Sequence, residues 1–445
     1  MTVKFAQAPT YTVPSKWDII PVHASDRGAF KFCRRQWSWS SPSRLNLTPR
    51  AELHGIRENL WFGTGIHHCL EKYYSPLRED PVVTWETWWN LECRGGLVHE
   101  SDLKNFTYRD PVPKGDGIFY IHGLDDIVPY FDEDEMGALL DLGRGMMTYY
   151  KDYAEANDNF TVIATEHDFS VPILDASGNP LYMVDNRKIP EGWEPDFEVS
   201  NEFGPLMRDA RSTERIEWSD RVGVDSEIIE KQCHARGRMD IIIQDNESGR
   251  YGIKDYKTAS KVDENYFRHL DLDEQCTTYL TLGEVEAIIY NLPYKKLEFI
   301  TYEALLKAYP KSPTILKNGL PSISRTTEST TPAMFQKCID ELGVRIIYDA
   351  DVKMQAYYEW LVANEATMFV NRQDRWRNQV QRMNARIRLY HETVEMLSPD
   401  LVCYPTPRKE YGCINCVFRT PCLMTEEGSD YMETLELGYV GNWGR

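Results

Sequence analysis

Residues 237–257 read Gly-Arg-Met-Asp-Ile-Ile-Ile-Gln-Asp-Asn-Glu-Ser-Gly-Arg-Tyr-Gly-Ile-Lys-Asp-Tyr-Lys. Two apolar runs with β-branched residues flank a polar cluster that ends in glycine, a pattern that predicts a β-hairpin. With a loop at 246–249, counting outward along the two strands places Asp240 directly opposite Asp255. Cross-strand partners lie about 5 Å apart, where like charges are unfavourable.

A divalent cation between these carboxylates would convert their repulsion into a binding site. Lys257 lies two residues beyond Asp255, so the strand period of two places both side chains on the same face. Two carboxylates and a lysine on one face predict a metal-dependent phosphodiesterase site. The same residues also fit an ordinary water-facing strand, and a one-residue shift in register would send one carboxylate to the other face.

The composition fits a folded protein with a real core. The chain has 445 residues, of which 42% are hydrophobic and 12% aromatic, enough for one large domain or two to three ordinary ones. We expect a cytoplasmic protein without membrane contact, because there is no signal-peptide pattern and no apolar run near about 18 residues. In that compartment the ten cysteines favour thiols or metal ligands over disulfides.

The net charge of −19 argues against a general polyanion binder, since affinity for nucleic acid depends on cationic side chains. One segment departs from this acidic mean, with six arginines and one aspartate between Arg372 and Arg388. Arg375, Arg382 and Arg386 fall near one side of a predicted helix, which indicates nucleic-acid contacts. A solvated helix face, or a set of salt-bridge donors, explains the same pattern equally well.

The pattern of helices, strands and loops divides the chain into five regions. They are an N-terminal segment (1–75), a helical or irregular insertion (76–160), a core with its own insertion at about 175–230 (161–302), a loop and helical region (303–397), and a C-terminal cysteine segment (398–445). Helices are predicted over 27–39, 60–74, 134–156 and 273–284, strands over 161–166 and 296–302, an exposed loop over 308–331, and two or three helices within 333–397.

A cysteine cluster lies near the C-terminus, where Cys413, Cys416 and Cys422 form a C-x2-C-x5-C segment. Short loops bring such thiolates together at little entropic cost, so they can surround one metal centre. A fourth ligand must come from elsewhere, and Cys33 and Cys403 are the candidates. Four thiolates suit either an iron–sulfur cluster or a structural zinc ion.

Three motifs follow one another along the chain. They are Gly63-Thr64-Gly65-Ile66-His67, then Asp240 with Asp255-Tyr256-Lys257, then Gln275-Cys276-Thr277-Thr278-Tyr279. Their order resembles that of RecB/AddB-type nucleases in the PD-(D/E)XK superfamily. The divided cysteine set is similar to that of the iron–sulfur subset, which includes AddB and the CRISPR-associated exonucleases. The resemblance does not cover residues 76–160, 175–230 or most of 308–397.

The resemblance implies an α/β fold with a restriction-endonuclease-like core: a small mixed sheet flanked by helices, helical insertions, and an Fe–S clasp that joins the N- and C-terminal regions. It implies a Mg²⁺- or Mn²⁺-dependent DNA exonuclease with a [4Fe–4S] cluster. Such an enzyme would act on single- or double-stranded DNA ends in recombination, repair or replication, with a protein partner in such a complex. Alternatives are a non-catalytic subunit that binds DNA ends, and a zinc-stapled nuclease that acts on RNA.

Carried onto this sequence, the resemblance assigns roles to the motif residues. The metal ligands would be His67, Asp240, Asp255 and the backbone carbonyl of Tyr256. Lys257 would orient or activate the attacking water, and Gln275 and Tyr279 would position the DNA or the lysine. The cluster ligands would be Cys33, Cys413, Cys416 and Cys422.

Two further residues are candidates for the site. Glu166 ends a predicted strand and would be either an additional metal-binding carboxylate or a surface residue, and Arg238 would contact nucleic acid. The sequence also departs from the family pattern. Arg34 follows the first cysteine where proline is common, and His68 beside His67 leaves the choice of ligand open. The long interval from His67 to Asp240 requires a sizeable insertion.

Overall fold

The computed structural model describes most of the chain. The described residues are 3–5, 19–41, 44–45, 47–50, 58–100, 103, 106, 112–127, 133–184, 193–201, 204–209, 215–216, 230–262, 264–271, 273–292, 294, 296–398, 401–406 and 412–441.

The hairpin predicted from the sequence forms the centre of the main sheet. Strand β12 (Glu230–Asp245) pairs antiparallel with β13 (Tyr251–Ala259), and the paired residues include Ile241 with Lys254. At the turn, the Asp245 N–H donates to the Arg250 carbonyl over 2.9 Å. The predicted register is therefore confirmed, and the next pair outward from Ile241 and Lys254 is Asp240 with Asp255.

The main sheet has eight strands and is mixed, with the order β1-β7-β12-β13-β14-β15 and with β2 and β8 also paired to β12. Strands β1 and β2 run parallel to their partners, as does β14 to β13, whereas the pairs of β7 and β8 with β12 and of β15 with β14 are antiparallel. The additional strands are β1 (Lys4–Phe5), β2 (Ile20–His23), β7 (Phe160–Pro172), β8 (Tyr182–Val184), β14 (Phe299–Leu306) and β15 (Val370–Trp376).

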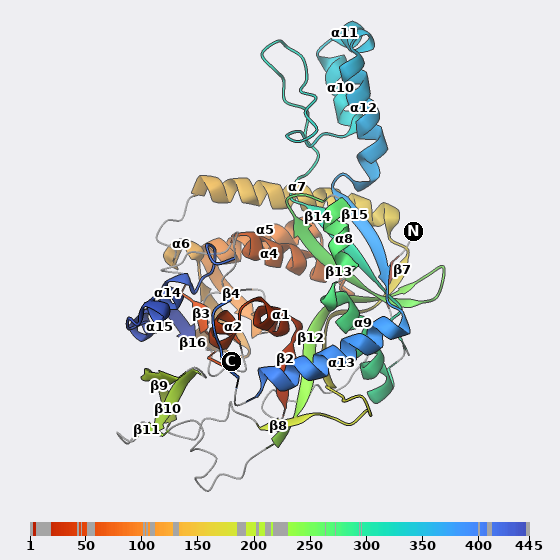
Figure 1. Ribbon diagram of the computed structural model, residues 1–445. Helices are drawn as coiled ribbons and strands as arrows, with labels where there is room; N and C mark the ends of the chain where they lie inside the picture. The colour runs from red at the N-terminus through yellow and green to blue at the C-terminus, as the bar shows by residue number, and fades with distance from the viewer. Residues whose placement is uncertain are drawn as a thin grey trace.

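Helices cover both faces of this sheet (Figure 1). On one face lie α4 (Glu58–Tyr73), α5 (Pro81–Arg94) and α7 (Glu133–Asn157), whose apolar side chains share a core with Ile241 and Ile243. On the other lie α1 (Ala24–Phe32), α9 (Glu274–Ile289) and α13 (Gln379–Met396), which pack around Ile242 and Ile253. The mixed sheet between helical layers confirms the predicted α/β fold class.

The remaining elements decorate this core. They are α2 (Arg34–Ser40), β3 (Leu47–Pro49), β4 (Gly95–His99), β5 (Val112–Gly115), β6 (Ile118–His122), α6 (Leu124–Ile127), β9 (Trp193–Asn201), β10 (Gly204–Asp209), β11 (Arg215–Ile216), α8 (Glu264–Leu270), α10 (Pro332–Glu341), α11 (Arg345–Ala350), α12 (Val352–Asn364), α14 (Arg419–Glu427), α15 (Met432–Gly438) and β16 (Tyr439–Gly441). Strands β9 to β11 form a separate antiparallel sheet inside the insertion predicted at about 175–230.

The N- and C-terminal regions meet in space. Strand β3 pairs antiparallel with β16, and Trp39 packs in one apolar cluster with Phe418 and Tyr439. Cys416 and Cys422 pack against the same cluster. Pairing and apolar burial therefore join the two regions.

Two predictions of secondary structure are wrong. The helix predicted over 27–39 is two helices, because Cys33 between them adopts an extended conformation with φ −160° and ψ 115°. The region 333–397, predicted to contain two or three helices, also contains strand β15 along the edge of the sheet. An edge strand has one free side and tolerates polar residues, so β15 lacks the apolar alternation that identifies a strand.

Among the described residues, no helix has both the length and the apolar character needed to cross a bilayer.

Candidate active site

Two carboxylates and a lysine meet on neighbouring strands of the central hairpin. The Tyr256 N–H donates to Oδ2 of Asp240 over 2.9 Å, which fixes the Asp240 side chain against β13. Lys257 Nζ lies 2.8 Å from Oδ2 of Asp255, and the Asp255 side chain is only 2% exposed. The three predicted side chains are therefore brought together.

The charges of this group are not balanced. Burial, and then the nearby Asp255 carboxylate, raise the pKa of Asp240 to about 7, although Lys257 and the Tyr256 N–H act in the opposite direction. Burial alone would lower the pKa of Lys257, but Asp255 and Asp240 outweigh it and raise that pKa. Lys257 is thus firmly protonated, while the two carboxylates still repel each other.

Helix α4 supplies the imidazole of the site. Nδ1 of His67 lies 3.5 Å from Oδ2 of Asp240. Burial and the Lys257 charge lower the pKa of His67, which favours the neutral ring that can bind a cation. Small residues on α4 let it pack closely: a Cβ at Gly63 would stand 3.3 Å from Thr258 Oγ1 of β13, and one at Gly65 would overlap the indole of Trp88 on α5.

Glu166 extends the row of acids onto a third strand. Its neighbours on β7 pair with the residues that flank Asp240, so Glu166 lies opposite Asp240 across β7 and β12. Its side chain is 16% exposed and lies 3.4 Å from the guanidinium of Arg238. Its negative charge also acts to raise the pKa of His67. The structure thus places Glu166 beside the site, in a left-handed conformation with φ 48°.

Gln275 connects the lysine with the carboxylate. Its Nε2 donates to Oδ1 of Asp255 over 3.3 Å, and its Oε1 accepts from Lys257 Nζ over 3.4 Å. Tyr279 follows one turn later on α9, where burial and Asp255 raise its pKa to about 12. Asp273 begins this helix by accepting a hydrogen bond from the Cys276 N–H.

The predicted nucleic-acid arginines lie on three different elements, β12, β15 and α13. Arg238 binds Asp168 over 2.7 Å, Arg375 lies on β15 and binds Asp271 over 2.9 Å, and Arg386 is half-buried on α13. Arg382 is 5% exposed, and its guanidinium donates to the carbonyls of Leu280 and Leu297. The prediction of one helix through these residues is wrong, and Arg382 serves the core instead of a nucleic-acid surface.

The four predicted cluster cysteines occupy one region. Cys33 Sγ accepts from the Thr406 N–H over 3.5 Å, and Cys413 Sγ lies 3.9 Å from the Thr406 carbonyl. Burial raises the pKa of Cys416, and Cys33, Cys422 and Cys413 contribute in the same direction. Cys403, the other candidate, is buried with its Sγ 4.0 Å from the Leu401 carbonyl.

Within the described residues, no set of three or more His, Cys, Asp or Glu side chains is arranged to enclose a metal ion. The chemistry of the hairpin donors nevertheless fits one. Asp240 and Asp255 offer hard oxygens to Mg²⁺ or Mn²⁺, His67 offers a neutral nitrogen, and the mutual repulsion of the carboxylates is what a cation would relieve.

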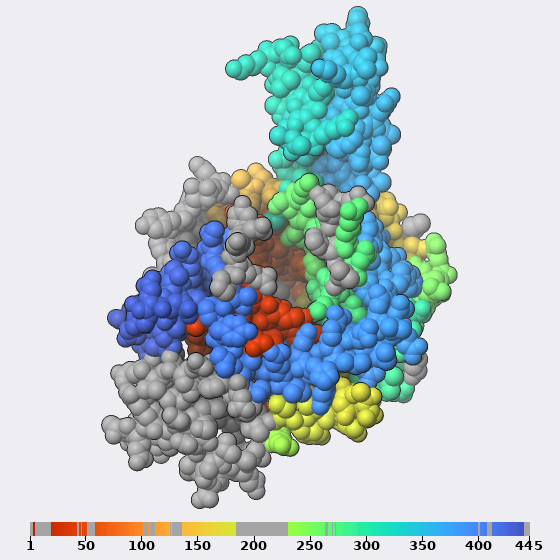
Figure 2. Space-filling view, in the orientation of Figure 1, coloured from red at the N-terminus to blue at the C-terminus, as the bar shows by residue number. Residues whose placement is uncertain are grey.

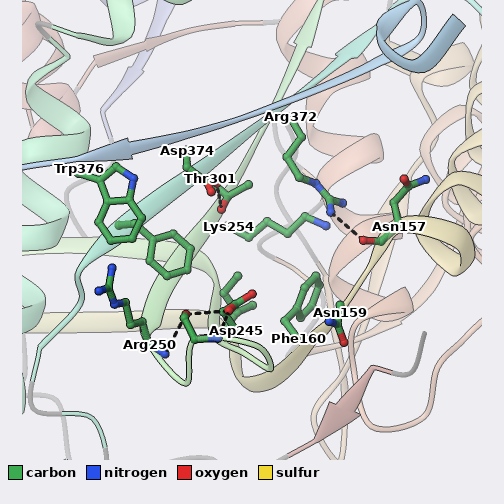
Figure 3. A pocket seen from close by; sticks show the side chains of 13 residues that line it. Asn157, Asn159, Phe160, Asp245, Arg250, Lys254, Thr301, Arg372, Asp374 and Trp376 are labelled. Carbon is green, nitrogen blue, oxygen red and sulfur yellow. Dashed lines mark hydrogen bonds between the residues drawn. The ribbon is translucent and has the colours of Figure 1, made fainter.

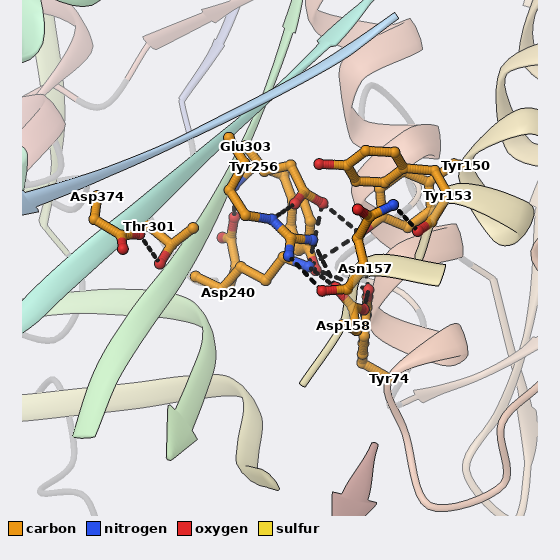
Figure 4. A network of polar contacts seen from close by, with 12 residues as sticks. Tyr74, Tyr150, Tyr153, Asn157, Asp158, Asp240, Tyr256, Thr301, Glu303 and Asp374 are labelled. Atoms are coloured by element: carbon orange, nitrogen blue, oxygen red, sulfur yellow. Dashed lines mark hydrogen bonds and ion pairs between the residues drawn. The ribbon is translucent and has the colours of Figure 1, made fainter. Parts of the chain in front are cut away.

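A buried ionic network, which was not predicted from the sequence, lies on the opposite face of β13 (Figure 4). Lys254 Nζ lies 3.4 Å from Asp158 and 3.2 Å from Glu303. Arg372 also binds both acids, over 2.6 and 2.5 Å, and Tyr150 donates to Glu303. Its signal in the sequence was Lys254, a cation that follows Ile253 in the predicted strand.

A pocket of about 310 Å³ opens on this same face of the sheet (Figure 3). Lys254, Thr301 and Arg372 line it, whereas Asp255 and Lys257 do not. Because successive side chains of a strand point to opposite faces, the pocket and the carboxylate pair lie on opposite sides of β13.

Comparison with known proteins agrees with the geometry. The model of the PD-(D/E)XK nuclease superfamily matches residues 24–422, which include all the hairpin residues and the cysteines from Cys33 to Cys422. No curated protein matches the chain. Since the match spans most of the sequence, the chain belongs to the PD-(D/E)XK nuclease superfamily.

Proposed function

We propose that this protein is a Mg²⁺- or Mn²⁺-dependent DNA exonuclease that acts at DNA ends in recombination, repair or replication. The observation that carries the proposal is the group formed by Asp240, Asp255 and Lys257, in which Gln275 contacts both Asp255 and Lys257. Membership in a nuclease superfamily supports hydrolysis of phosphodiester bonds.

Each residue of this group has a chemical task in such a reaction. Asp240, Asp255 and His67 would hold the ion, with the Tyr256 carbonyl beside them. A divalent ion supplies positive charge to the reacting phosphate and acidifies water. Lys257 places a permanent cation where negative charge develops, because its pKa is raised by both carboxylates. Gln275 would fix the relative positions of Lys257 and Asp255 through its hydrogen bonds to both side chains.

The test compares the native chain with Asp255→Asn and Lys257→Ala on end-labelled linear DNA, circular DNA and RNA, with Mg²⁺, Mn²⁺ or a chelator. We expect metal-dependent loss of linear DNA from its ends, and a decrease of about 100-fold or more in rate for either variant. Asp175→Asn, in an exposed turn, is the matched control and should cut normally. Normal cutting by Asp255→Asn or Lys257→Ala would refute the proposal.

We also propose that Cys33, Cys413, Cys416 and Cys422 hold a [4Fe–4S] cluster. Supporting this, Cys33 and Cys413 both contact the backbone of Thr406. A protein purified without oxygen should absorb near roughly 400 nm and contain iron. A colourless protein with stoichiometric zinc would show that the cysteines hold zinc instead of an iron–sulfur cluster. That result would leave the proposed nuclease activity unaffected.

A further inference from the structure

An extended insertion, residues 307–369, leaves the sheet after β14 and returns to it as β15 (Figure 1). We name it the arm, and its first part, residues 307–331, the arm loop. Helices α10 to α12 give the arm its own apolar core around Phe335 and Tyr357. The arm loop has a net charge of +3 in a chain of −19. Its charged residues are Lys307, Lys311, Lys317, Arg325 and Glu328.

Backbone hydrogen bonds order the arm loop. The Lys311 N–H donates to the Ser329 carbonyl over 2.9 Å, and the Ser322 N–H donates to the Thr314 carbonyl over 2.8 Å. Gly319, with φ 78°, completes the turn at the tip. The basic side chains therefore extend from a defined, hairpin-like scaffold.

Three of these cations lie over aromatic rings. Lys307 is 5.0 Å from the centre of the Phe62 ring, Lys311 is 4.3 Å from that of Tyr309, and Arg325 is 5.4 Å from that of Trp360. None of the three forms an ion pair with a carboxylate in the described part of the chain. An aromatic ring orients a cation without cancelling its charge, so these charges are available to an anion.

Three of the arginines between 372 and 388 differ in this respect. Arg372 binds two buried acids, Arg375 binds Asp271 over 2.9 Å, and Arg388 lies 3.7 Å from Glu274. Their charges are engaged within the fold. Lys311 and Arg325 of the arm loop have no such carboxylate partner among the described residues.

The arm loop begins beside the candidate active site. The Lys307 N–H donates to the carbonyl of Ala259 over 2.8 Å, four residues beyond Asp255 on the same strand. At about 3.3 Å per residue, this is roughly 13 Å from the carboxylate. Lys307 Nζ also binds Asn59 of α4, the helix that carries His67. Figure 2 shows the arm above a hollow between the N-terminal helices and α8.

We infer that the arm loop binds the phosphates of a single-stranded nucleic-acid segment whose end enters the Asp240/Asp255 site. This inference rests on the proposed function. A strand with one negative charge per nucleotide complements Lys307, Lys311 and Arg325. A positively charged surface that follows the backbone is typical of proteins that bind single strands without sequence preference. The position of Lys307 links this surface to the site.

The test uses Lys311→Ala/Arg325→Ala, because both side chains are exposed and their removal spares the core. Binding of a fluorescent single-stranded oligonucleotide is measured by anisotropy in metal-free buffer over a range of salt concentrations. We expect affinity to fall about tenfold at moderate salt. The slope of log affinity against log salt should decrease by about 1.4, which corresponds to two lost phosphate contacts. Lys307→Gln should lower the same slope by about 0.7.

Lys337→Ala/Lys353→Ala is the matched control, since it removes two charges from exposed positions elsewhere on the arm. It should retain the native slope. Equal slopes for the native chain and both double variants, in a protein that cuts DNA, would overturn this inference alone. A native chain that neither binds nor cuts nucleic acid would overturn the proposed function and the inference together.

Discussion

A buried carboxylate that faces another carboxylate keeps its proton near neutral pH unless a cation takes the place of that proton. Asp240 is such a group, because burial and Asp255 raise its pKa to about 7. Lys257 reduces this shift without removing it, although its ammonium lies 2.8 Å from Asp255. His67 adds a neutral nitrogen on the same side. A divalent ion is the partner that this combination of side chains accommodates.

His234 on β12 makes stability depend on pH. Its Nδ1 contacts Ser170 over 3.0 Å, and burial, then the Arg236 charge, lower its pKa to about 4. Because this value is below the ordinary 6.5, the contribution to stability is present above that pH and is lost as pH falls toward 4. We therefore expect protonation of His234 to lower the free energy of unfolding, measured in urea, by on the order of 1 kcal/mol between about pH 7.5 and about pH 5.

The comparison that isolates this group is His234→Gln against His391→Gln, whose side chain is exposed. The first variant should lose part of the acid-induced decrease, and the second should keep all of it. An identical decrease in both variants and the native chain would assign the pH dependence to other groups.

At the scale of a single element, strand β13 serves two purposes through its alternation. Asp255 and Lys257 face the candidate site, and Lys254 and Tyr256 face the buried network. The network balances two cations with two acids, and Lys254 also lies 4.8 Å from the centre of the Tyr74 ring. The buried network on one face of β13 thus stabilises the strand that carries Asp255 and Lys257 on its other face.

Lys254→Met should be strongly destabilising, by about 3–5 kcal/mol, because it leaves Asp158 and Glu303 with only Arg372 to compensate them. Urea unfolding measures the loss. Lys254→Met/Glu303→Gln should recover part of it, since the second change removes the acid left without Lys254. Native-like stability of the single variant would show that the network does not contribute to the stability of the fold.

Sequence patterns identified the hairpin and missed strand β15 of the same sheet for a physical reason. The register of β12 and β13 follows from a short local turn, so counting from Gly249 suffices to pair Asp240 with Asp255. Strand β15 pairs with β14, but the whole arm, residues 307–369, separates the two strands in the sequence. The buried network likewise needs α7, β13, β14 and β15 in contact, and such long-range contacts leave no periodic signal.

At the scale of the whole molecule, the N-terminal and C-terminal regions of the chain are in contact. Strand β3 pairs with β16, and the Trp39 ring lies 5.5 Å from that of Phe418 and 6.0 Å from that of Tyr431. The family match also spans residues 24–422, from α1 through the last of the clustered cysteines. Apolar contacts between the terminal regions and the proposed cluster would therefore reinforce each other.

Trp39→Ala tests this coupling. Loss of a buried tryptophan costs about 3–5 kcal/mol, and here the lost contacts join opposite ends of the chain. We expect hydrogen exchange to accelerate in α15 and β16 before the central hairpin is affected, together with loss of any iron held by Cys416 and Cys422. Trp376→Ala is the control, because that indole is 48% exposed at the sheet edge. Unchanged protection of residues 432–441 in Trp39→Ala would mean that the terminal regions are held together by other contacts.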